Sequence, residues 1–424
     1  MSDPLPRFFR VRQKFDDTRV ELIEREVQHA MVSSVPMQLH RIHRGQSVAI
    51  AVGSRGISQI ATIVKGVVDF VRQQGGVPFI FPAMGSHGGA TAEGQAALLA
   101  GYGITPDAMG CEVRASMDTQ VLGTTSAGVD VHVDALAMKA DHIILVNRIK
   151  PHTRIIGPYE SGLVKMMLIG LGKHKGAAEY HRAMTRQRFD EIVAEAAPMI
   201  LAHTRLLMGL AIVENAFDEV AHIEAIEADQ ILNREPELLE LARRKMPRLP
   251  FEEADLVIID RIGKNISGTG LDTNVVGRKT NDKVAGPNEW PKVQQIYVRG
   301  LTPETKGNAS GIGIAEYCRS EVVREMDVEV TRINCFTALH VSAAAIPVHY
   351  ETDREVLEIA VDQAGRSRLV DFRCVWIPDT LHLGEVWCSE AYWDEALKRE
   401  DLEVEFEPRA LRWSEAGNLL AADS

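Results

Sequence analysis

The feature that most constrains the fold is an alternation of short apolar runs with glycine turns and helical segments. Apolar runs cover residues 46–53, 77–81 and 140–149, and the first two are followed by the helix-like stretches 57–74 and 91–104. The run at 140–149 is apolar throughout its centre, which is typical of a parallel strand buried on both faces. This alternation predicts an α/β fold with a parallel sheet.

The same pattern restarts after a proline-punctuated segment, MPRLPFEE. The run ADLVIID at residues 254–260 opens another α/β unit, and a chain of 424 residues is long enough for two domains. We therefore expect two Rossmann-like α/β domains with the active-site cleft between them. The expected divisions are residues 1–250 for the N-terminal domain, 251–390 for the C-terminal domain, and 391–424 for a tail that packs back on the first domain.

Composition and charge exclude several classes of protein. A formal net charge of −12 and a pI near 5.7 leave no basic surface for nucleic acid, and no run of about 18 apolar residues is present to span a membrane. The charged N-terminus, MSDPLPRFFRVRQKFDD, lacks the apolar core of a secretion signal. Five cysteines form no CxxC pair, which predicts reduced thiols and a cytoplasmic location. The oligomeric state is left open.

A histidine stands in the glycine turn GSHGG, where an apolar run gives way to a helix beginning near Thr91. Glycines at such a turn let a ligand approach the backbone, and ligands of α/β proteins bind at the carboxyl ends of parallel strands. His87 is therefore a candidate site residue. Glycine turns with a capping serine are common, so the turn alone equally fits a plain connection.

Residues 147–182 concentrate charge and histidine in a stretch that is otherwise glycine-rich and apolar. The stretch contains His152, His174 and His181, and it places Lys165 inside the apolar run LVKMMLIGLG. A buried, unpaired ammonium is unfavourable, so such a lysine is paired, chemically used, or on the solvent face of an ordinary helix. Since His152 follows the third apolar run, it should lie at the same sheet edge as the first histidine turn.

These motifs resemble the functional positions of the nickel-dependent lactate racemase family. The matching stretches are GSHGGAT around His87, KPHT around His152, SGLVKMMLIG around Lys165, and AEYH, which ends at His181. The resemblance spans most of the chain and is strongest over residues 53–182.

The resemblance implies a cofactor, the nickel-pincer nucleotide (pyridinium-3,5-bisthiocarboxylic acid mononucleotide nickel), covalently linked to Lys165. It also implies that His181 ligates nickel, with His174 as the alternative ligand, and that His87 and His152 act as acid and base. The implied activity is that of an isomerase, a racemase or epimerase of a 2-hydroxy acid that works by hydride transfer to this cofactor. Its partners would be the small-molecule substrate and the enzymes that build the cofactor.

The resemblance requires a break in the helix that carries Lys165. We expect this helix to begin near Ser161, which is a suitable N-cap. If the helix continued to His181, the two site residues would be about 24 Å apart, which is too far for one small cofactor. Three glycines offer positions for the break, namely Gly170, Gly172 and Gly176.

Two motifs depart from the family pattern. Val52 and Gly53 replace the family's Asp-Arg pair, whose arginine holds the substrate carboxylate, and Arg55 matches the arginine that follows. In the second domain Val276 and Gly277 stand where the family has tyrosine and glutamine. We therefore expect a larger or differently anchored hydroxy acid than lactate.

Besides Lys165, the resemblance makes several residues candidates for cofactor binding. Lys279 is a further candidate to supply the positive charge that the family's substrate-holding arginine provides and this chain lacks at residues 52 and 53. The candidates are Arg55, Lys264, Asp272, Asn274 and Arg278.

Two other functions fit the same residues. A metal-dependent hydrolase or lyase would hold a simple divalent ion with His152, His174 and His181. A non-catalytic relative would bind a small acid in the same cleft without any chemistry.

Overall fold

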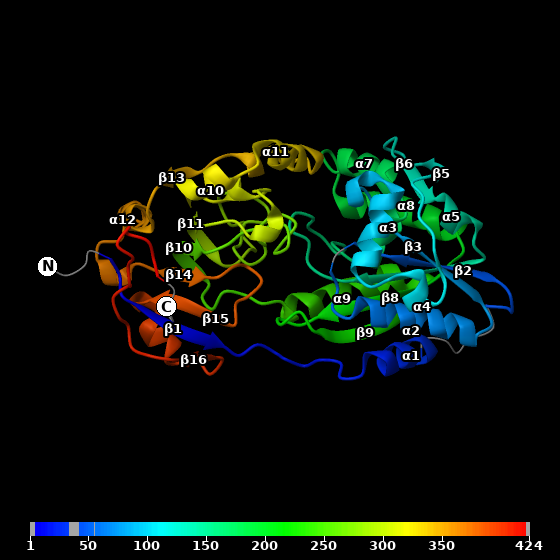
Figure 1. Cartoon of the computed structure of the whole chain (residues 1–424), viewed down its shortest axis with the longest axis horizontal. Coiled ribbons are helices and arrows are strands. Elements are labelled where there is room, and N and C mark those ends of the chain that lie inside the picture. Colours follow the sequence, from blue (N-terminus) through cyan, green and yellow to red (C-terminus); the bar gives the residue numbers. More distant parts are fainter. Residues whose placement is uncertain (1–4, 34–41, 55, 421–424) are drawn as a thin grey trace. The chain divides into compact units, whose positions relative to one another are not determined.

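The computed structural model describes residues 5–33, 42–54 and 56–420. The chain forms two compact units, one of residues 17–246 and one that joins residues 1–16 to residues 247–424 (Figure 1). Each unit contains a sheet with parallel strands and helices, so the predicted α/β fold is confirmed. Within the described ranges, no helix has the length and apolar character needed to cross a membrane.

A six-stranded sheet forms the centre of the 17–246 unit. In spatial order its strands are β4 (Glu112–Val113), β3 (Val77–Pro82), β2 (Ser47–Val52), β7 (His142–Arg148), β8 (Leu206–Glu214) and β9 (Val220–Glu227). Pairing is parallel from β4 to β8, and β9 returns antiparallel to β8. A separate hairpin joins β5 (Thr119–Thr124) to β6 (Asp130–Asp134).

Helices cover both faces of this sheet. They are α1 (Ile23–Ser33), α2 (Ile60–Gln73), α3 (Ala92–Gly101), α4 (Pro106–Met109), α5 (Ala135–Lys139), α6 (Leu163–Lys165), the π-helical turn η2 (Met166–Gly170), α7 (Lys173–Ala183), α8 (Phe189–His203) and α9 (Ile231–Lys245). Alternate residues of a strand point to opposite faces. Ala49 and Ala51 of β2 therefore pack in the core that includes α7, α8 and α9, while Val48 and Ile50 pack in the core that includes α1 and α2.

An eight-stranded sheet forms the centre of the other unit. In spatial order its strands are β13 (Val348–Tyr350), β12 (Tyr317–Arg319), β11 (Lys292–Val298), β10 (Glu253–Ile259), β14 (Cys374–Ile377), β15 (Glu385–Ser389), β1 (Phe8–Gln13) and β16 (Leu402–Val404). The strands from β13 to β14 are parallel, and β15, β1 and β16 are antiparallel to their neighbours. Its longer helices are α10 (Ser320–Glu325), α11 (Val328–Thr337) and α12 (Asp353–Gln363).

The divisions of the chain differ from those expected from the sequence. The units part between Met246 and Pro247, and the first residues of the chain belong to the C-terminal unit because β1 pairs with both β15 and β16. The described part of the tail lies in this same unit and does not join the 17–246 unit. Ladder hydrogen bonds between strands from opposite ends of the chain leave no local pattern, and for that reason the sequence did not reveal them.

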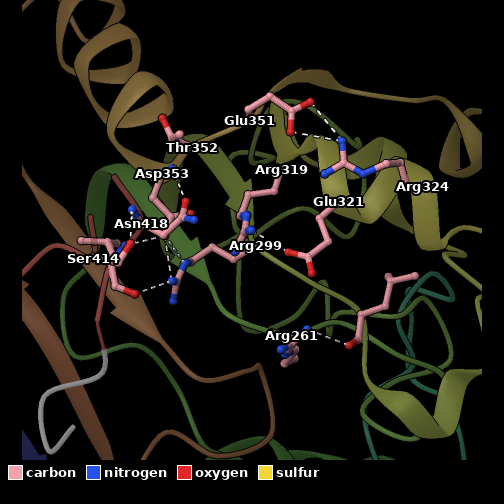
Figure 2. Close-up of polar contacts among 12 residues, drawn as sticks. Arg261, Arg299, Arg319, Glu321, Arg324, Glu351, Thr352, Asp353, Ser414 and Asn418 are labelled. Atoms are coloured by element: carbon pink, nitrogen blue, oxygen red, sulfur yellow. Dashed lines mark hydrogen bonds and ion pairs between the residues drawn. The ribbon is translucent and has the colours of Figure 1, made fainter. Parts of the chain in front are cut away.

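A buried ion pair beyond the end of β11 connects the C-terminal sheet to α12 and to the tail. Arg299 Nη2 lies 2.7 Å from Asp353 Oδ2 and 2.9 Å from the carbonyl oxygen of Leu419 (Figure 2). The Asp353 side chain is fully buried. Arg324 and Glu351, which Figure 2 also shows, form an ion pair whose two side chains are exposed.

We expect Asp353→Asn to lower the free energy of unfolding of the C-terminal unit by about 3 kcal/mol, because it removes a charged partner from a mostly buried guanidinium. The matched control Glu351→Gln should leave stability unchanged, because water screens an exposed pair. Equilibrium denaturation in urea measures both, and equal midpoints for the two variants would contradict the prediction.

Candidate active site

The helix that carries Lys165 is interrupted before it reaches His181. Lys165 ends α6, η2 follows, and α7 begins at Lys173, whose φ of 55° is left-handed. Gly170 and Gly172 allow this path, because a Cβ at either position would lie within 2.8 and 2.5 Å of a backbone carbonyl oxygen. The predicted break is confirmed, and it uses two of the three glycines that the sequence offers.

A buried ion pair holds the break in place. Lys173 and Asp134 are both fully buried, and Lys173 Nζ lies 2.9 Å from Asp134 Oδ2. Lys173 also donates to the carbonyl oxygen of Pro82 and, at 3.4 Å, to Gln95 Oε1. Burial lowers the pKa of Lys173, and Asp134 opposes that shift. The first turn of α7 is thereby fixed to β6, to the end of β3 and to α3.

His87 lies in the glycine turn between β3 and α3, and its side chain is exposed. Gln95 holds this turn through its amide, which donates to the carbonyl oxygens of Gly85 at 3.0 Å and His87 at 3.2 Å. The imidazole Nδ1 contacts Ser54 Oγ, which follows β2. Because Gln95 also contacts Lys173, the His87 turn and the helix break share one hydrogen-bond network.

His152 lies in the turn after β7 and is half-buried. Its backbone amide donates to Glu160 Oε2 at 2.7 Å, and its Nδ1 accepts from the amides of Arg154 and Ile155, both at 3.0 Å. In the neutral imidazole these contacts assign the proton to Nε2, since Nδ1 must keep its lone pair to accept. The turn therefore fixes both the backbone and the tautomer of His152.

The ends of three parallel strands meet around α6 and η2. Gly53, just after β2, has no room for a side chain, because a Cβ would lie 2.9 Å from Asn147 Oδ1. Asn147 in β7 donates to the carbonyl oxygen of Gly162 at 2.7 Å. Gly85, beyond β3, packs on Ile169 of η2, where a Cβ would be 3.1 Å from Cγ2. The structure thus brings the segments of His87, His152 and Lys165 to one sheet edge, as the sequence predicts.

His181 lies in the last turn of α7 and is half-buried. Burial, with a further contribution from the positive charge of Lys165, lowers the pKa of His181 to about 4. The imidazole is therefore neutral at pH 7, which is the form that binds a metal ion. The break in the helix allows the charge of Lys165 to act on His181 in this way.

His174, the alternative metal ligand, is exposed in the first turn of α7. It lies about 10 Å from His181 along the helix axis, so the two imidazoles do not share one ion. Among the residues that the structure describes, no three His, Cys, Asp or Glu side chains are grouped to hold a metal ion. The three-histidine site expected for a simple divalent ion is therefore not formed by His152, His174 and His181.

Of the other expected cofactor-binding residues, those that the structure describes form hydrogen bonds within the C-terminal unit. Arg55 is outside the described residues. Lys264 Nζ donates to Asn334 Oδ1 at 2.8 Å. Asp272 is buried, and its Oδ1 accepts from the side-chain amide of Asn274 at 2.9 Å.

Arg278 is a correction to the sequence-based prediction. It has no exposed surface, and its guanidinium donates to the carbonyl oxygens of Asp282 at 2.8 Å and Val293 at 2.9 Å. Glu316 lies 3.3 Å away and balances its charge. These contacts assign Arg278 a structural role inside the C-terminal unit. A lysine or arginine in a glycine-rich loop cannot be assigned to a ligand by charge alone, because its burial depends on distant segments.

The residues that hold the site together are not evident from the sequence. Lys173 could have been singled out, because it directly follows the glycines at which the helix was expected to break. Its partners Asp134 and Gln95, and Glu160 behind His152, carry no local signal, since each meets its partner only in the folded sheet.

We expect Lys165→Met to raise the pKa of His181, because removing a nearby positive charge makes protonation easier. Lys175→Met is the matched control, since it removes an exposed lysine from α7, the helix that carries His181. An NMR titration of the histidine ring signals, with His181 assigned from His181→Gln, measures the shift. An unchanged pKa in Lys165→Met, or the same shift in both variants, would show that the two site residues are not neighbours.

Comparisons with known proteins bear on the family and the fold. Residues 11–191 match the model of the lactate racemase N-terminal domain, whereas a comparison with curated proteins returns no match. The lactate racemase apoprotein from Thermoanaerobacterium thermosaccharolyticum is structurally similar, with a TM-score of 0.55, 13% identity, and coverage of 88% of this chain and 93% of that one. A protein from Thermotoga maritima has a TM-score of 0.54 and 13% identity over 85% of this chain and 97% of its own.

At this level of identity the structural likeness shows the fold alone, and the family evidence comes from the N-terminal domain. The resemblance recognised in the motifs around His87, His152 and Lys165 is confirmed at the level of the family. Residues 11–191 therefore match the N-terminal domain of the lactate racemase family, and the chain has the fold of a lactate racemase apoprotein over most of its length.

Proposed function

We propose that this protein is an isomerase that racemises or epimerises a 2-hydroxy acid, with a nickel-pincer nucleotide carried on Lys165. The observation that most directly supports the proposal is the break between α6 and α7, because it gives the Lys165 amine and a neutral His181 a common neighbourhood. The lactate racemase N-terminal domain at residues 11–191 supports a function related to that family.

The side chains present fit such a cofactor better than a bare metal ion. His181 offers one neutral imidazole, and no further group of metal-binding side chains surrounds it in the described part of the chain. A single protein ligand is sufficient where an organic group brings the remaining donors, and sulfur donors with imidazole suit nickel. Lys165 is half-buried between apolar residues, which is a suitable place for a covalent attachment.

When bound, the nucleotide would supply reversible uptake of the substrate's α-hydrogen together with its electron pair. The chain's own histidines would handle the hydroxyl proton that leaves and returns in the same reaction. His152 would offer the substrate an Nε2–H donor, since Nδ1 accepts from two backbone amides. Proton uptake at Nε2 would require the ring proton to lie on Nδ1 and these two contacts to open. His87, whose Nδ1 contacts Ser54 Oγ, would act on the opposite enantiomer.

The proposed substrate is a 2-hydroxy acid other than lactate. Val52 and Gly53 carry no charge where family members hold the substrate carboxylate, so the acid must be anchored differently. Arg55, Lys264 and Lys279 are candidates for that anchor. A cytoplasmic location, dependence on cofactor-building enzymes, and the absence of nucleic-acid and membrane partners stay predictions from composition and resemblance.

We expect protein produced together with the cofactor-building enzymes to carry a covalent adduct that Lys165→Ala abolishes, together with racemase activity. His87→Gln and His152→Gln should retain the adduct and lose activity by a factor of about 10² to 10⁴, since each removes a general acid or base. Intact-mass spectrometry reports the adduct, and chiral chromatography of a panel of hydroxy acids reports the activity.

Two results would contradict the proposal. One is protein without an adduct after co-production, or with an adduct that survives Lys165→Ala. The other is racemisation that continues unchanged when both His87 and His152 are replaced.

A further inference from the structure

We infer that helix α9 positions the His152 turn and Lys165 relative to each other, because it holds the segment from His152 to Lys165 through three separate contacts. The segment leaves β7, makes the His152 turn and ends in α6. The effect of this positioning on turnover rests on the proposed function, whereas the contacts themselves do not. The residues on α9 that make the contacts are Leu232, Glu235 and Arg243.

The first contact fixes the His152 turn. Glu160 is buried, and its two carboxylate oxygens have different partners. Oε2 accepts from the amide of His152 at 2.7 Å, and Oε1 accepts from Arg243 Nη2 at 2.6 Å. Arg243 is itself partly exposed and also contacts Glu240. The backbone of His152 is therefore tied to α9 through one carboxylate.

The second contact uses an irregularity of α9. Pro236 lies inside the helix and has no backbone N–H, so the carbonyl oxygen of Leu232, four residues earlier, lacks its usual helical donor. The hydroxyl of Tyr159 donates to this oxygen at 2.9 Å. A proline that would weaken an isolated helix thus creates an attachment point for the middle of the segment.

The third contact fixes the start of α6. Ser161, the N-cap expected from the sequence, does not cap this helix, which begins at Leu163 after Gly162 with no capping side chain. Instead Glu235 Oε2 accepts from the amide of Val164 at 2.8 Å. Glu235 lies so close to Gly162 that a Cβ there would be 2.5 Å from Oε1. The carboxylate of Glu235 therefore sets the position from which Lys165 extends.

The three α9 residues lie on one side of the helix. Residues 232 and 243 are eleven positions apart, which is close to three full turns, and residue 235 is about 60° from the first and about 80° from the second. They cover about 16 Å of the helix axis, so one rigid element spans the whole segment. Arg234 points to the other side, where it pairs with Glu224 at 2.8 Å.

Hydrogen exchange measured by mass spectrometry tests the contacts without any cofactor. Arg243→Met should speed exchange in peptides covering residues 150–161 roughly tenfold, since it frees Glu160 and weakens the bond to the His152 amide. Arg234→Met, on the same helix, is the matched control and should leave these peptides unchanged. Equal exchange in the two variants would overturn the inference at the His152 turn.

The contact at α6 is tested in the same way with a conservative partner. Glu235→Leu should speed exchange at residues 162–166 roughly tenfold, and Glu235→Gln should restore protection, because its amide oxygen still accepts from Val164. Protection that survives Glu235→Leu, or that Glu235→Gln fails to restore, would overturn the role of this carboxylate. If Glu235→Leu does not fold, Glu235→Gln and Tyr159→Phe still test the contacts.

Turnover of the cofactor-loaded protein tests the positioning role itself. Arg243→Met should lower kcat by about tenfold to a hundredfold with little change in KM, because it displaces a catalytic group without removing a substrate contact. Arg234→Met should match the unmodified protein. Faster exchange with unchanged kcat would overturn the positioning role. If even the unmodified protein is inactive, the proposed function fails, and the exchange data still decide whether α9 holds the segment.

Discussion

The arrangement of the site depends on the buried ion pair between Lys173 and Asp134. A fully buried ammonium is tolerated because a carboxylate lies 2.9 Å away and a carbonyl oxygen of the sheet accepts a further hydrogen bond. This pair holds Lys173 in a left-handed conformation that would otherwise be unfavourable. The left-handed residue interrupts the helical path between η2 and α7, so Lys165 and His181 do not lie on one continuous helix.

Two further sets of contacts extend from this break. Gln95 connects Lys173 to the His87 turn, and α9 connects Lys165 to the His152 turn. The four functional segments are therefore not placed independently, since the His87 turn and the start of α7 share Gln95, and the His152 turn and the start of α6 are both held by α9. A cofactor of fixed shape needs such rigidity, because groups that act together must keep their separation when the substrate is bound.

Much of this architecture could be predicted from the sequence. Buried parallel strands leave continuous apolar runs, so β2, β3 and β7 were recognisable, and the turns after them located His87 and His152. The 16-residue separation of Lys165 from His181 required a break, and the glycines showed where. What could not be predicted depends on distant partners. The cap of α6 comes from Glu235, the final strand pairs with the first one, and Arg278 is buried by segments far from its own loop.

Cross-linking measures whether the broken helix brings residues 165 and 181 together. In a variant with Cys111 replaced by serine, cysteines at positions 165 and 181 would be treated with a thiol cross-linker that reaches no more than about 10 Å, whereas an unbroken helix would hold them about 24 Å apart. We expect efficient intramolecular cross-linking in the folded protein. Absence of the cross-link, with both thiols still reactive toward a single-site reagent, would contradict it.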